Sequence, residues 1–298
     1  MHSSKPLIIV TGSAGQLGLC IQDIAPLYPH LHFEFTDVDR LDITHPHALE
    51  QYLEESQLSQ APSLLINCAA YTVVDKAESE PQKATLLNTH AVEYLAQSCR
   101  LLGCMMIQIS TDYVFDGKGY IPYTTTDTKN PQSIYGHTKS MAEDIVCDIL
   151  GDHALVLRTA WLYSPYCANF ALTMLRLAKE KEIVKVVDDQ IGSPTYAPHL
   201  AQILCMITDC ALRERSFRTR YLHYTDAGVC SWYDFAHSII SQSPFSSRCK
   251  VLPIPSSDYP VPAKRPFYSV LSKQEIQHIY GVIPTHWSVG VTEFLNKI

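Results

Sequence analysis

Short apolar runs alternate with segments of helical periodicity along the first half of the chain. Such runs are typical of buried strands, whereas apolar residues that recur every three or four positions occupy one face of a helix. We predict strands at Leu7–Val10, His32–Thr36, Leu64–Asn67, Met105–Ser110 and Leu155–Arg158. Helices are predicted near Leu17–Ala25, Pro46–Ser56, Ala84–Leu102 and Tyr135–Ile149. Thr44 is expected to cap the second helix, with Pro46 in its first turn. This alternation predicts an α/β fold built on a doubly wound parallel sheet.

The pattern changes after about residue 160. We predict an amphipathic helix at Asn169–Lys181, a strand at Ile183–Val187 and a helix at Pro198–Arg213. Ser231 followed by an acidic residue three positions later is typical of a helix start, and Pro253–Pro266 is expected to be an ordered, irregular loop. We therefore expect a first domain at 1–160 and a smaller C-terminal lobe at 161–298 that packs directly on it. Some segments of the lobe are free to return to the first domain.

Composition narrows the class of protein. The 298 residues include 46% hydrophobic and 18% charged residues, which suits a well-filled core. A formal net charge of −7 argues against a nucleic acid or an anionic membrane as a partner. The ten cysteines include no C-x-x-C pair, and we find neither a secretory signal nor an apolar stretch long enough to span a bilayer. These features favour a cytoplasmic protein with reduced thiols.

A glycine-rich loop follows the first predicted strand. Gly12, Gly15 and Gly18 are spaced G-x-x-G-x-x-G and precede a helical segment. Glycines in this position allow a tight turn and let backbone amides approach a pyrophosphate at the helix N-terminus. We expect Gln16 and Leu17 to belong to the same dinucleotide site of a Rossmann-type domain. A simple tight turn is the alternative, and this spacing is associated with tyrosine-dependent short-chain reductases.

Two cues on the choice of cofactor disagree. Asp37 ends the second strand about 20 residues past the loop, where an acid accepts a hydrogen bond from a ribose 2′-hydroxyl, which favours NAD. Arg40 lies three residues further and could meet a 2′-phosphate instead, so we predict use of both NADH and NADPH. Capping of strand ends is the alternative for the acids. Further cofactor contacts are expected from Asp42, Ile43, Ala69, Ala70 and Tyr71.

Tyr135 and Lys139 are four residues apart in a predicted helix, so their side chains share one face. Thr111 closes a strand at the carboxyl edge of the sheet and can donate a hydrogen bond to a carbonyl oxygen, which Tyr135 can protonate. We expect Lys139 to lower the pKa of the phenol from about 10 toward neutrality and to hold the nicotinamide ribose. Each residue alone could be structural. Their order behind a glycine loop favours a catalytic set of Thr111, Tyr135 and Lys139.

Asp112 and Tyr113 follow the threonine. Sugar-nucleotide dehydratases on this scaffold carry an Asp-Glu pair at that place, which supplies an additional acid and base. Tyr113 in the second position argues against a lyase and for simple carbonyl reduction.

The chain resembles the dTDP-4-dehydrorhamnose reductases, a family of extended short-chain dehydrogenases/reductases. The segments that carry the resemblance are Gly15–Gly18, Asn67–Glu78, Ser110–Gly117, Tyr135–Lys139, Arg158–Tyr163, Asn169–Phe170, Asp189–Thr195 and Pro262–Pro266. The resemblance implies reduction of the C4 ketone of dTDP-4-dehydro-β-L-rhamnose to dTDP-L-rhamnose for surface polysaccharide. The chain departs from the family pattern at His137 and Ala142, and neither residue takes part in proton transfer.

The resemblance also implies a substrate site. Thr111 and Asp112, with Tyr113 beside them, and Trp161 are expected to line the sugar pocket, where the indole supplies an apolar wall. Asn169 and Arg265 are candidates for the diphosphate, although core packing and a surface salt bridge are alternatives for Trp161 and Arg265. Some relatives bind Mg²⁺ through glutamates at a dimer contact. Those ligands do not map onto this chain by motif, so no metal ligand is predicted, and Mg²⁺ and a homodimer stay open.

Two other functions remain open from the sequence. The first is an NDP-sugar epimerase of the same superfamily. The second is a non-catalytic regulatory subunit that binds a dinucleotide, as in the similar β subunit of methionine adenosyltransferase. An epimerase would retain tightly bound NAD, whereas a regulatory subunit would bind a partner enzyme.

Overall fold

The computed structural model describes residues 5–56, 58 and 60–298. Its centre is a six-stranded sheet with the order β10-β5-β4-β3-β1-β2, in which every neighbouring pair is parallel. The prediction of a doubly wound α/β fold is confirmed. The strands are β1 (Leu7–Thr11), β2 (His32–Thr36), β3 (Leu64–Asn67), β4 (Met105–Thr111), β5 (Ala154–Thr159) and β10 (Tyr221–His223).

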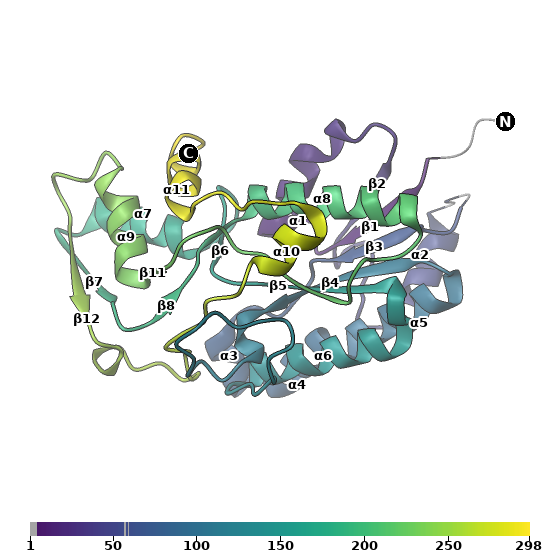
Figure 1. Ribbon diagram of the computed structural model, residues 1–298, viewed down its shortest axis with the longest axis horizontal. Coiled ribbons are helices and arrows are strands. Elements are labelled where there is room, and N and C mark those ends of the chain that lie inside the picture. Colours follow the sequence, from purple (N-terminus) through teal and green to yellow (C-terminus); the bar gives the residue numbers. More distant parts are fainter. Residues whose placement is uncertain (1–4, 57, 59) are drawn as a thin grey trace.

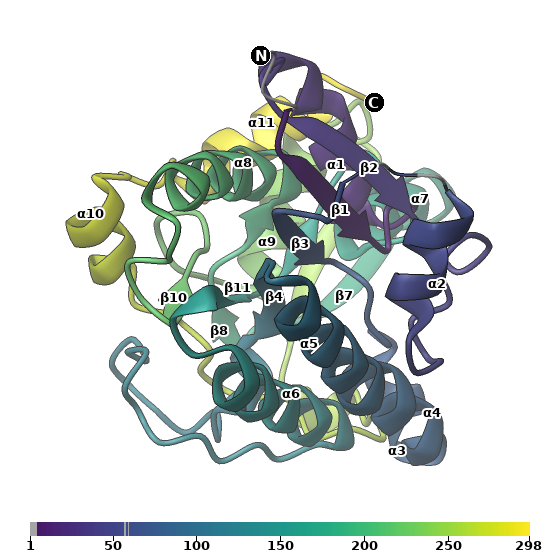
Figure 2. The same ribbon diagram turned by 90° about the vertical axis from the view of Figure 1, so that its right-hand side faces the viewer.

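Helices cover both faces of this sheet (Figures 1 and 2). Alternate residues of one strand face opposite layers, so Ile8 and Val10 belong to one core cluster while Leu7 and Ile9 belong to another. The first layer is formed by α1 (Gln16–Ile24) and α8 (Ala197–Glu214), which contact each other. The second is formed by α2 (Ala48–Glu55), α5 (Ala91–Leu102) and α6 (Ile134–Leu150). Burial on both faces explains why the strands read as continuous apolar runs.

The strand order reverses between β1 and β3. β1 pairs with β2 on one side and with β3 on the other, and the loops that leave β1 and β3 at their carboxyl ends therefore lead to opposite sides. In open α/β sheets, ligands bind in the crevice at such a switch point. A ligand site is therefore expected at the loops that follow β1 and β3.

The second lobe has its own core at the left of Figure 1. It contains α7 (Phe170–Glu180), α9 (Trp232–Ser241) and α11 (Trp287–Leu295), packed with the parallel pair β7 (Ile183–Val187) and β12 (Lys250–Ile254). The antiparallel pair β8 (Ile191–Gly192) and β11 (Cys230–Ser231) adjoins it, as does the parallel pair β6 (Leu162–Tyr163) and β9 (Thr195–Tyr196). Segments beyond residue 160 also serve the first sheet, because β10 pairs with β5 and α8 packs on α1.

The remaining helical elements are short. They are 3₁₀ turns at Ala25–Leu27, Asp112–Val114, Gly151–His153 and Ser256–Asp258, a π-helical turn at Leu86–His90, and helices α3 (Val74–Ser79), α4 (Pro81–Thr85) and α10 (Gln274–Tyr280).

Local predictions of helix ends were right in part. The helix start predicted at Ser231 is confirmed, and a capping box with Asp234 forms there. The helix predicted from Asn169 begins at Phe170, with Asn169 as its N-cap. The predicted cap at Thr44 is wrong, because α2 begins only at Ala48 after His47, whose φ is 60°. The Thr44 hydroxyl donates instead to Asp42 at 2.7 Å, an alternative that a turn offers to a short polar side chain.

Two further boundaries differ from the prediction. The helix expected at Ala84–Leu102 is divided by the π-helical turn Leu86–His90. The proline-rich stretch begins within a strand, because Pro253 pairs with Val186 in the two-stranded β7–β12 sheet. A proline is tolerated there because every strand of a two-stranded sheet has a free edge.

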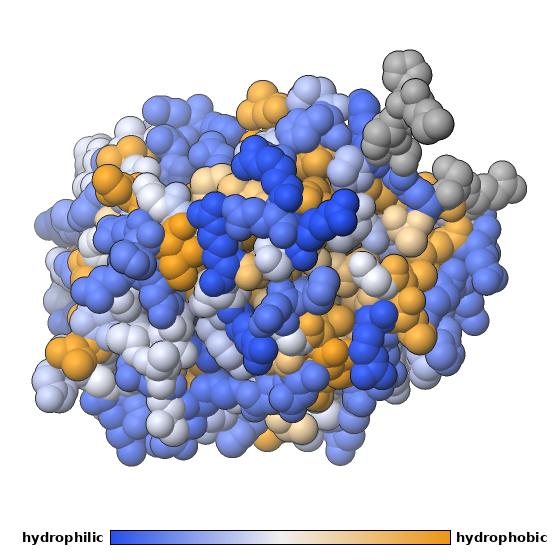
Figure 3. Space-filling view, turned by 45° about the vertical axis from the view of Figure 1, so that its right-hand side comes forward, coloured by the Kyte–Doolittle hydropathy of each residue, from blue (hydrophilic) through white to orange (hydrophobic). Residues whose placement is uncertain are grey.

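The surface is mixed in character. On the face drawn in Figure 3, hydrophobic residues lie in small groups among hydrophilic ones. Across 5–56, 58 and 60–298, no helix has the length and apolarity needed to cross a membrane. The ten cysteines all carry free thiols.

Candidate active site

A cavity of about 970 Å³ runs along the carboxyl ends of the sheet and reaches the second lobe. This volume is at the upper end of the range for ligand sites, about 300–1,000 Å³. Most of the predicted site residues line it, although they come from segments far apart in the sequence. They are Gly12, Gly15, Gln16, Leu17, Asp37, Asp42, Ile43, Ala69, Ala70, Thr111, Asp112, Tyr113, Tyr135, Lys139, Trp161, Asn169 and Arg265. Three predicted residues, Gly18, Arg40 and Tyr71, are described by the structure but do not belong to this lining.

The glycine loop is built for close backbone approach. Gly12 has a φ of +64°, and a Cβ there would lie 2.6 Å from the backbone nitrogen of Ala69 after β3. A Cβ on Gly18 would lie 2.5 Å from the Cα of Ser13, so this glycine packs helix α1 against its own loop and is not a ligand contact. Helix α1 starts after Gly15 without a side-chain cap, which leaves its first N–H groups directed at the cavity.

The two cofactor cues lie in different environments. Asp37 lines the cavity, and its carboxylate accepts hydrogen bonds from the backbone N–H groups of Ala14 at 2.9 Å and Val38 at 2.8 Å. Arg40 instead pairs with Glu34 at 2.9 Å, and its guanidinium lies 5.4 Å from the ring centre of Tyr52. The aspartate is therefore placed for a ribose, whereas the arginine must leave its partner to reach a phosphate.

Two other residues predicted to contact the cofactor, Asp42 and Tyr71, form hydrogen bonds within the protein. Asp42 lines the cavity, but its carboxylate accepts from the Thr44 hydroxyl and backbone N–H, which lowers the pKa of Asp42. Tyr71 is turned away, with its hydroxyl donating to Glu80 at 2.8 Å. Its backbone N–H donates to Asn88 at 2.8 Å. Asp42 thus stabilises a turn beyond the end of β2, while still belonging to the cavity lining.

The three predicted catalytic residues converge on the cavity. Thr111 is the last residue of β4, and Tyr135 and Lys139 share the first turns of α6, which Ser133 caps by accepting from the Gly136 N–H at 3.1 Å. The Thr111 hydroxyl is close enough to the phenol to act on its pKa. The i, i+4 spacing and the strand end together bring these groups into one place.

The expected acidification of the phenol is wrong for this structure. Burial raises the pKa of Tyr135 above its ordinary value of 10, and the nearby Asp112 and Tyr113 add to the rise. The ammonium of Lys139 donates to the carbonyl oxygen of Ile109 at 2.6 Å. Burial lowers the pKa of Lys139 to about 8, while the carboxylate of Glu143 opposes that change. Desolvation disfavours the charged form of each group, and neither side chain is among the causes of the pKa shift of the other.

A buried ion pair lies behind this lysine, and the sequence did not indicate it as part of the site. Glu143, one turn after Lys139 on α6, accepts from Arg158 at 2.7 Å and 2.9 Å. The Ser110 hydroxyl donates to the same carboxylate at 2.5 Å. Because charges and hydrogen bonds are matched, the pair can persist in the core and fix α6 against β4 and β5.

Asp112 belongs to the cavity wall, but its carboxylate is almost entirely buried. Its Oδ1 accepts from the Thr111 hydroxyl at 2.9 Å, whereas Oδ2 is buried without a partner among the described residues. Burial raises the pKa of Asp112 to about 6. The Thr111 and Ser269 hydroxyls oppose that rise, but burial of the carboxyl outweighs them.

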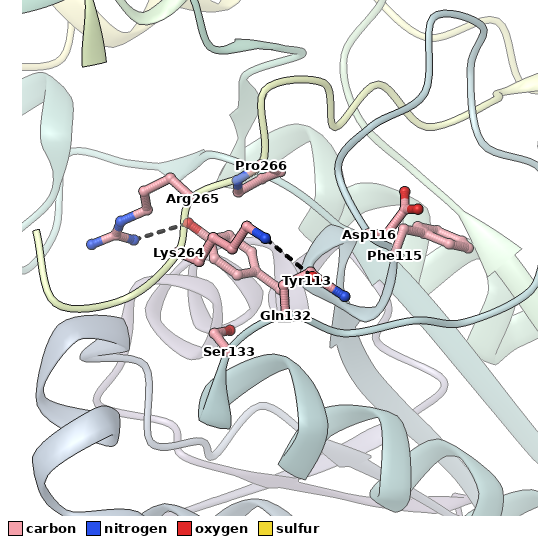
Figure 4. A pocket seen from close by; sticks show the side chains of 8 residues that line it. All are labelled: Tyr113, Phe115, Asp116, Gln132, Ser133, Lys264, Arg265 and Pro266. Carbon is pink, nitrogen blue, oxygen red and sulfur yellow. Dashed lines mark hydrogen bonds between the residues drawn. The ribbon is translucent and has the colours of Figure 1, made fainter. Parts of the chain in front are cut away.

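Arg265 links the second lobe to this wall (Figure 4). Its guanidinium donates to the Tyr113 hydroxyl at 2.9 Å and to Asp75 at 2.6 Å. The Tyr113 ring in turn meets the Tyr135 ring edge-on, with 5.5 Å between centres. Beside it, Lys264 donates to Gln132 at 3.3 Å across a small recess. The salt-bridge alternative for Arg265 is therefore present, but the arginine also lines the main cavity.

Two residues predicted to bind substrate, Asn169 and Trp161, lie at the second lobe and differ in their surroundings. Asn169 caps α7, and its amide donates to the carbonyl oxygens of Ser164, Tyr166 and Cys167. Its polar atoms thus hold a loop and are not free for a diphosphate. Trp161 stacks on Trp232, with 3.6 Å between ring centres and 10° between planes.

Several lining residues were not predicted. One of them is Trp232, for which the sequence indicates only a place at a helix start and no contact with Trp161. Other unpredicted lining residues are small or apolar and include Thr11, Val38, Leu41, Cys68, Thr72, Leu87, Thr159 and Cys167. Among residues 5–56, 58 and 60–298, no group of three or more His, Cys, Asp or Glu side chains could hold a metal ion. The open question of Mg²⁺ therefore finds no support.

Comparison with known proteins gives consistent matches. The family model described as the RmlD substrate binding domain matches residues 6–298. A dTDP-4-dehydrorhamnose reductase of Escherichia coli (strain K12) is 36% identical over 298 residues, which cover 98% of this chain and 97% of that protein.

Solved structures agree. A dTDP-4-dehydrorhamnose reductase from Clostridium acetobutylicum has a TM-score of 0.89 at 37% identity, covering 98% of this chain and 99% of that one. Another from Bacillus anthracis, solved in complex with NADP, has a TM-score of 0.88 at 33% identity and covers 99% of this chain and 100% of that one. The similarity thus includes both the sheet and the second lobe.

Proposed function

The chain belongs to the dTDP-4-dehydrorhamnose reductase family, and on that premise we propose that it uses NAD(P)H to reduce the C4 ketone of dTDP-4-dehydro-β-L-rhamnose. The product is dTDP-L-rhamnose, a precursor for surface polysaccharide. The observation that carries the proposal is the convergence of Thr111, Tyr135 and Lys139 on the cavity that also contains the glycine loop. A reductase needs a proton donor beside its cofactor, and this arrangement supplies one.

The cavity fits a dinucleotide. The close approach of Gly12 to Ala69 and the uncapped start of α1 form a cradle that a side chain would fill. We assign Gly15, Gln16 and Leu17 to the pyrophosphate, Asp37 to the adenosine ribose, and Ala69 and Ala70 to the neighbouring wall. When bound, NAD(P)H supplies the hydride that reduces the carbonyl carbon.

Tyr135 delivers the proton. Its raised pKa keeps the phenol protonated at neutral pH, so a proton is available for the ketone oxygen as negative charge develops there. The Thr111 hydroxyl donates a hydrogen bond to the same oxygen. Lys139, positively charged below its pKa of about 8, stabilises the phenolate that forms and holds the nicotinamide ribose. The electron pair enters the carbon and the proton enters the oxygen, so a hydroxyl replaces the ketone.

The substrate side of the cavity selects a sugar nucleotide. We assign Asp112, a lining residue, to a sugar hydroxyl, and the Trp161 indole to the methyl group as an apolar wall. We assign the diphosphate to Arg265, whose planar guanidinium matches phosphate oxygens. Tyr113 orients that guanidinium by the bond at 2.9 Å.

We propose that the enzyme accepts both reduced cofactors. Asp37 in the cavity wall favours a free ribose 2′-hydroxyl and hence NADH. The Arg40 side chain is half-exposed, so it can exchange Glu34 for a 2′-phosphate at little cost. Because Asp37 and Arg40 can serve different cofactors without excluding each other, the site accommodates both NADH and NADPH.

A division at residue 160, with the dinucleotide domain before it and mainly the substrate-binding lobe after it, is part of the same proposal. Because α8 and β10 follow residue 160 but pack on the first domain, the proposed boundary divides cofactor binding from substrate binding and does not divide the chain into two separate folding units. A homodimer is likewise proposed, and sedimentation of the purified protein would test it. A monomer across the working concentration range would contradict it.

The direct test is reduction of purified dTDP-4-dehydro sugar by the isolated protein. NADH and NADPH are supplied separately, and dTDP-L-rhamnose is identified as the product. We expect turnover with both cofactors. An epimerase would instead arrive with bound NAD and need no added cofactor, and a regulatory subunit would oxidise neither cofactor while retaining a partner enzyme in a pull-down.

A further inference from the structure

The sugar pocket has a wall made of two stacked indoles. Trp161 and Trp232 both line the cavity, with 3.6 Å between their ring centres and 10° between their planes. They come from different parts of the fold, since Trp161 follows β5 and Trp232 opens α9. A near-parallel pair at this separation covers one face of each ring and fixes their relative position.

Trp161 needs outside support to hold its position. Its φ is +51°, in the left-handed region that bulky residues rarely adopt. Such a conformation persists only when the surrounding structure over-determines it, and it is often found at ligand sites. The backbone is held on one side, because the Thr195 N–H donates to the Trp161 carbonyl oxygen at 3.2 Å. Its indole must be held by packing.

One two-stranded unit supplies that packing. Gly192 of β8 pairs with Cys230 of β11, and α9 follows β11 directly. A Cβ on Gly192 would lie 2.6 Å from Cε2 of Trp161, so only glycine allows the indole to lie there. Trp232 then stacks on the same indole from the next element. The strand pair and the helix that follows it therefore each contact Trp161 through one residue, Gly192 and Trp232.

The second lobe backs this arrangement with further aromatic rings. The Phe170 ring centre is 4.5 Å from that of Trp232, and Phe170 is itself stacked on Phe235 at 5.5 Å. Phe235 is fully buried in the lobe core. A continuous row of rings thus connects the core of the second lobe to the wall of the cavity.

We propose that Trp232 is a positioning residue that holds the Trp161 indole as the apolar wall of the sugar pocket. The inference rests on the proposed function and adds a residue to it. Because Trp232 acts on the wall and not on the cofactor loop, its loss should weaken binding of the sugar nucleotide and leave binding of the dinucleotide unchanged. Gly192 serves the same wall by leaving room for it.

The test compares matched tryptophan variants. Trp232→Leu is set against Trp287→Leu, because Trp287 also meets Phe235, at 6.1 Å, but does not belong to the cavity lining. We expect Trp232→Leu to raise KM for the dTDP-4-dehydro sugar about tenfold, the most that one aromatic pair would contribute. The value of kcat should change much less, and KM for NADPH should not change. Trp287→Leu should leave KM for the sugar unchanged.

Further variants separate positioning from simple loss of stability. Trp232→Phe retains a stacking ring and should recover most of the affinity for the sugar. Gly192→Ala, which displaces the indole from another direction, should raise the same KM, and the double variant with Trp232→Leu should show less than the sum of the two effects. An exciton-coupled tryptophan band in the circular dichroism of the wild type should survive Trp287→Phe and disappear in Trp232→Phe.

The outcomes are distinguishable. If the wild type reduces the sugar but Trp232→Leu and Trp287→Leu show the same KM, the inference is wrong and the proposed function stands. Equal losses of sugar and NADPH binding in Trp232→Leu would also overturn it, as would absence of the exciton band in the wild type. A wild type that does not reduce the sugar overturns both the function and the inference.

Discussion

The ammonium of Lys139 donates a hydrogen bond to the carbonyl oxygen of Ile109, with 2.6 Å between the two atoms. Ile109 lies two residues before Thr111 on β4, so the lysine ties the start of α6 to the strand that ends in the site. The ammonium is therefore held by a backbone carbonyl oxygen, and its residue lines the cavity. The phenol of Tyr135 stays protonated in this arrangement, which suits a proton donor.

Replacing Tyr135 by phenylalanine removes the proposed proton donor while keeping the ring. We expect turnover to fall by about 10²–10⁴-fold, the usual contribution of a positioned acid. NADPH affinity should change little, because the hydroxyl does not belong to the glycine loop. Stopped-flow rates and a fluorescence titration with NADPH would measure the two quantities. Turnover near that of the wild type would remove Tyr135 from the mechanism.

The rate should fall as pH rises through about 8. The pKa of Lys139 is lowered to about 8 by burial, so above that pH the ammonium loses its proton and its ability to stabilise a phenolate. The kcat profile of the wild type should therefore decline on its alkaline side. Lys139→Arg keeps a positive charge at every accessible pH. If this variant is active and still shows the same decline, another group is responsible.

We expect replacement of Asp112 to raise the stability of the fold and to lower its activity. Burial raises its pKa from 3.8 to about 6, so the folded state holds the proton more tightly than the unfolded state between these values. Stability contributed at this position therefore falls as pH rises from about 4 to 6, and above that range the buried charge is a cost. Asp112→Asn should raise the free energy of unfolding at pH 7 by about 1–3 kcal/mol and lower kcat/KM for the sugar. Urea denaturation and initial rates would measure both, and a destabilised but fully active variant would contradict the assignment.

His199 should stabilise the fold mainly at low pH. It lies between Asp226 at 3.0 Å and Glu293 at 2.9 Å, and so joins α8 to the C-terminal helix α11. Burial lowers the pKa of His199, but the two carboxylates outweigh that effect and the net shift is upward. The contribution is fully present below the unfolded pKa of about 6.5 and is lost as pH rises through the folded value. His199→Gln should lose about 1–3 kcal/mol of unfolding free energy at pH 6 and less at pH 9. A loss that is independent of pH would indicate packing alone.

Asp37 should affect one cofactor more than the other. A carboxylate in the cavity wall can accept from the 2′-hydroxyl of the adenosine ribose, which is free in NADH and phosphorylated in NADPH. Asp37→Ala should therefore raise KM for NADH more than KM for NADPH. The substitution also removes the bond to the Ala14 N–H, so a general loosening of the loop would weaken both. Equal losses for NADH and NADPH would argue for that structural role.

The sequence was informative wherever neighbours along the chain decide the structure. Strands β2 and β3 begin and end at the predicted residues. The apolar run of β3 is fully buried, which leaves it few alternative registers. The glycine loop, the cap at Asn169 and the capping box at Ser231 depend on residues within a few positions of one another. The cap at Thr44 failed because the same hydroxyl could bond Asp42 just as locally. Neighbouring residues thus offer a hydroxyl more than one hydrogen-bond partner, and the packing of the folded chain determines which one it bonds.

The chain by itself determined the sheet, the loop and the helix face that carries Tyr135 and Lys139. Only the tertiary structure decided that Arg40 turns to Glu34, that Arg265 meets Tyr113 and that Trp161 stacks on Trp232. It also reversed the expected pKa of Tyr135, because the free energy of a charge depends on how much water the assembled fold removes from it. Contacts between distant segments and the loss of solvent are properties of the packed molecule, and no spacing along the sequence encodes them.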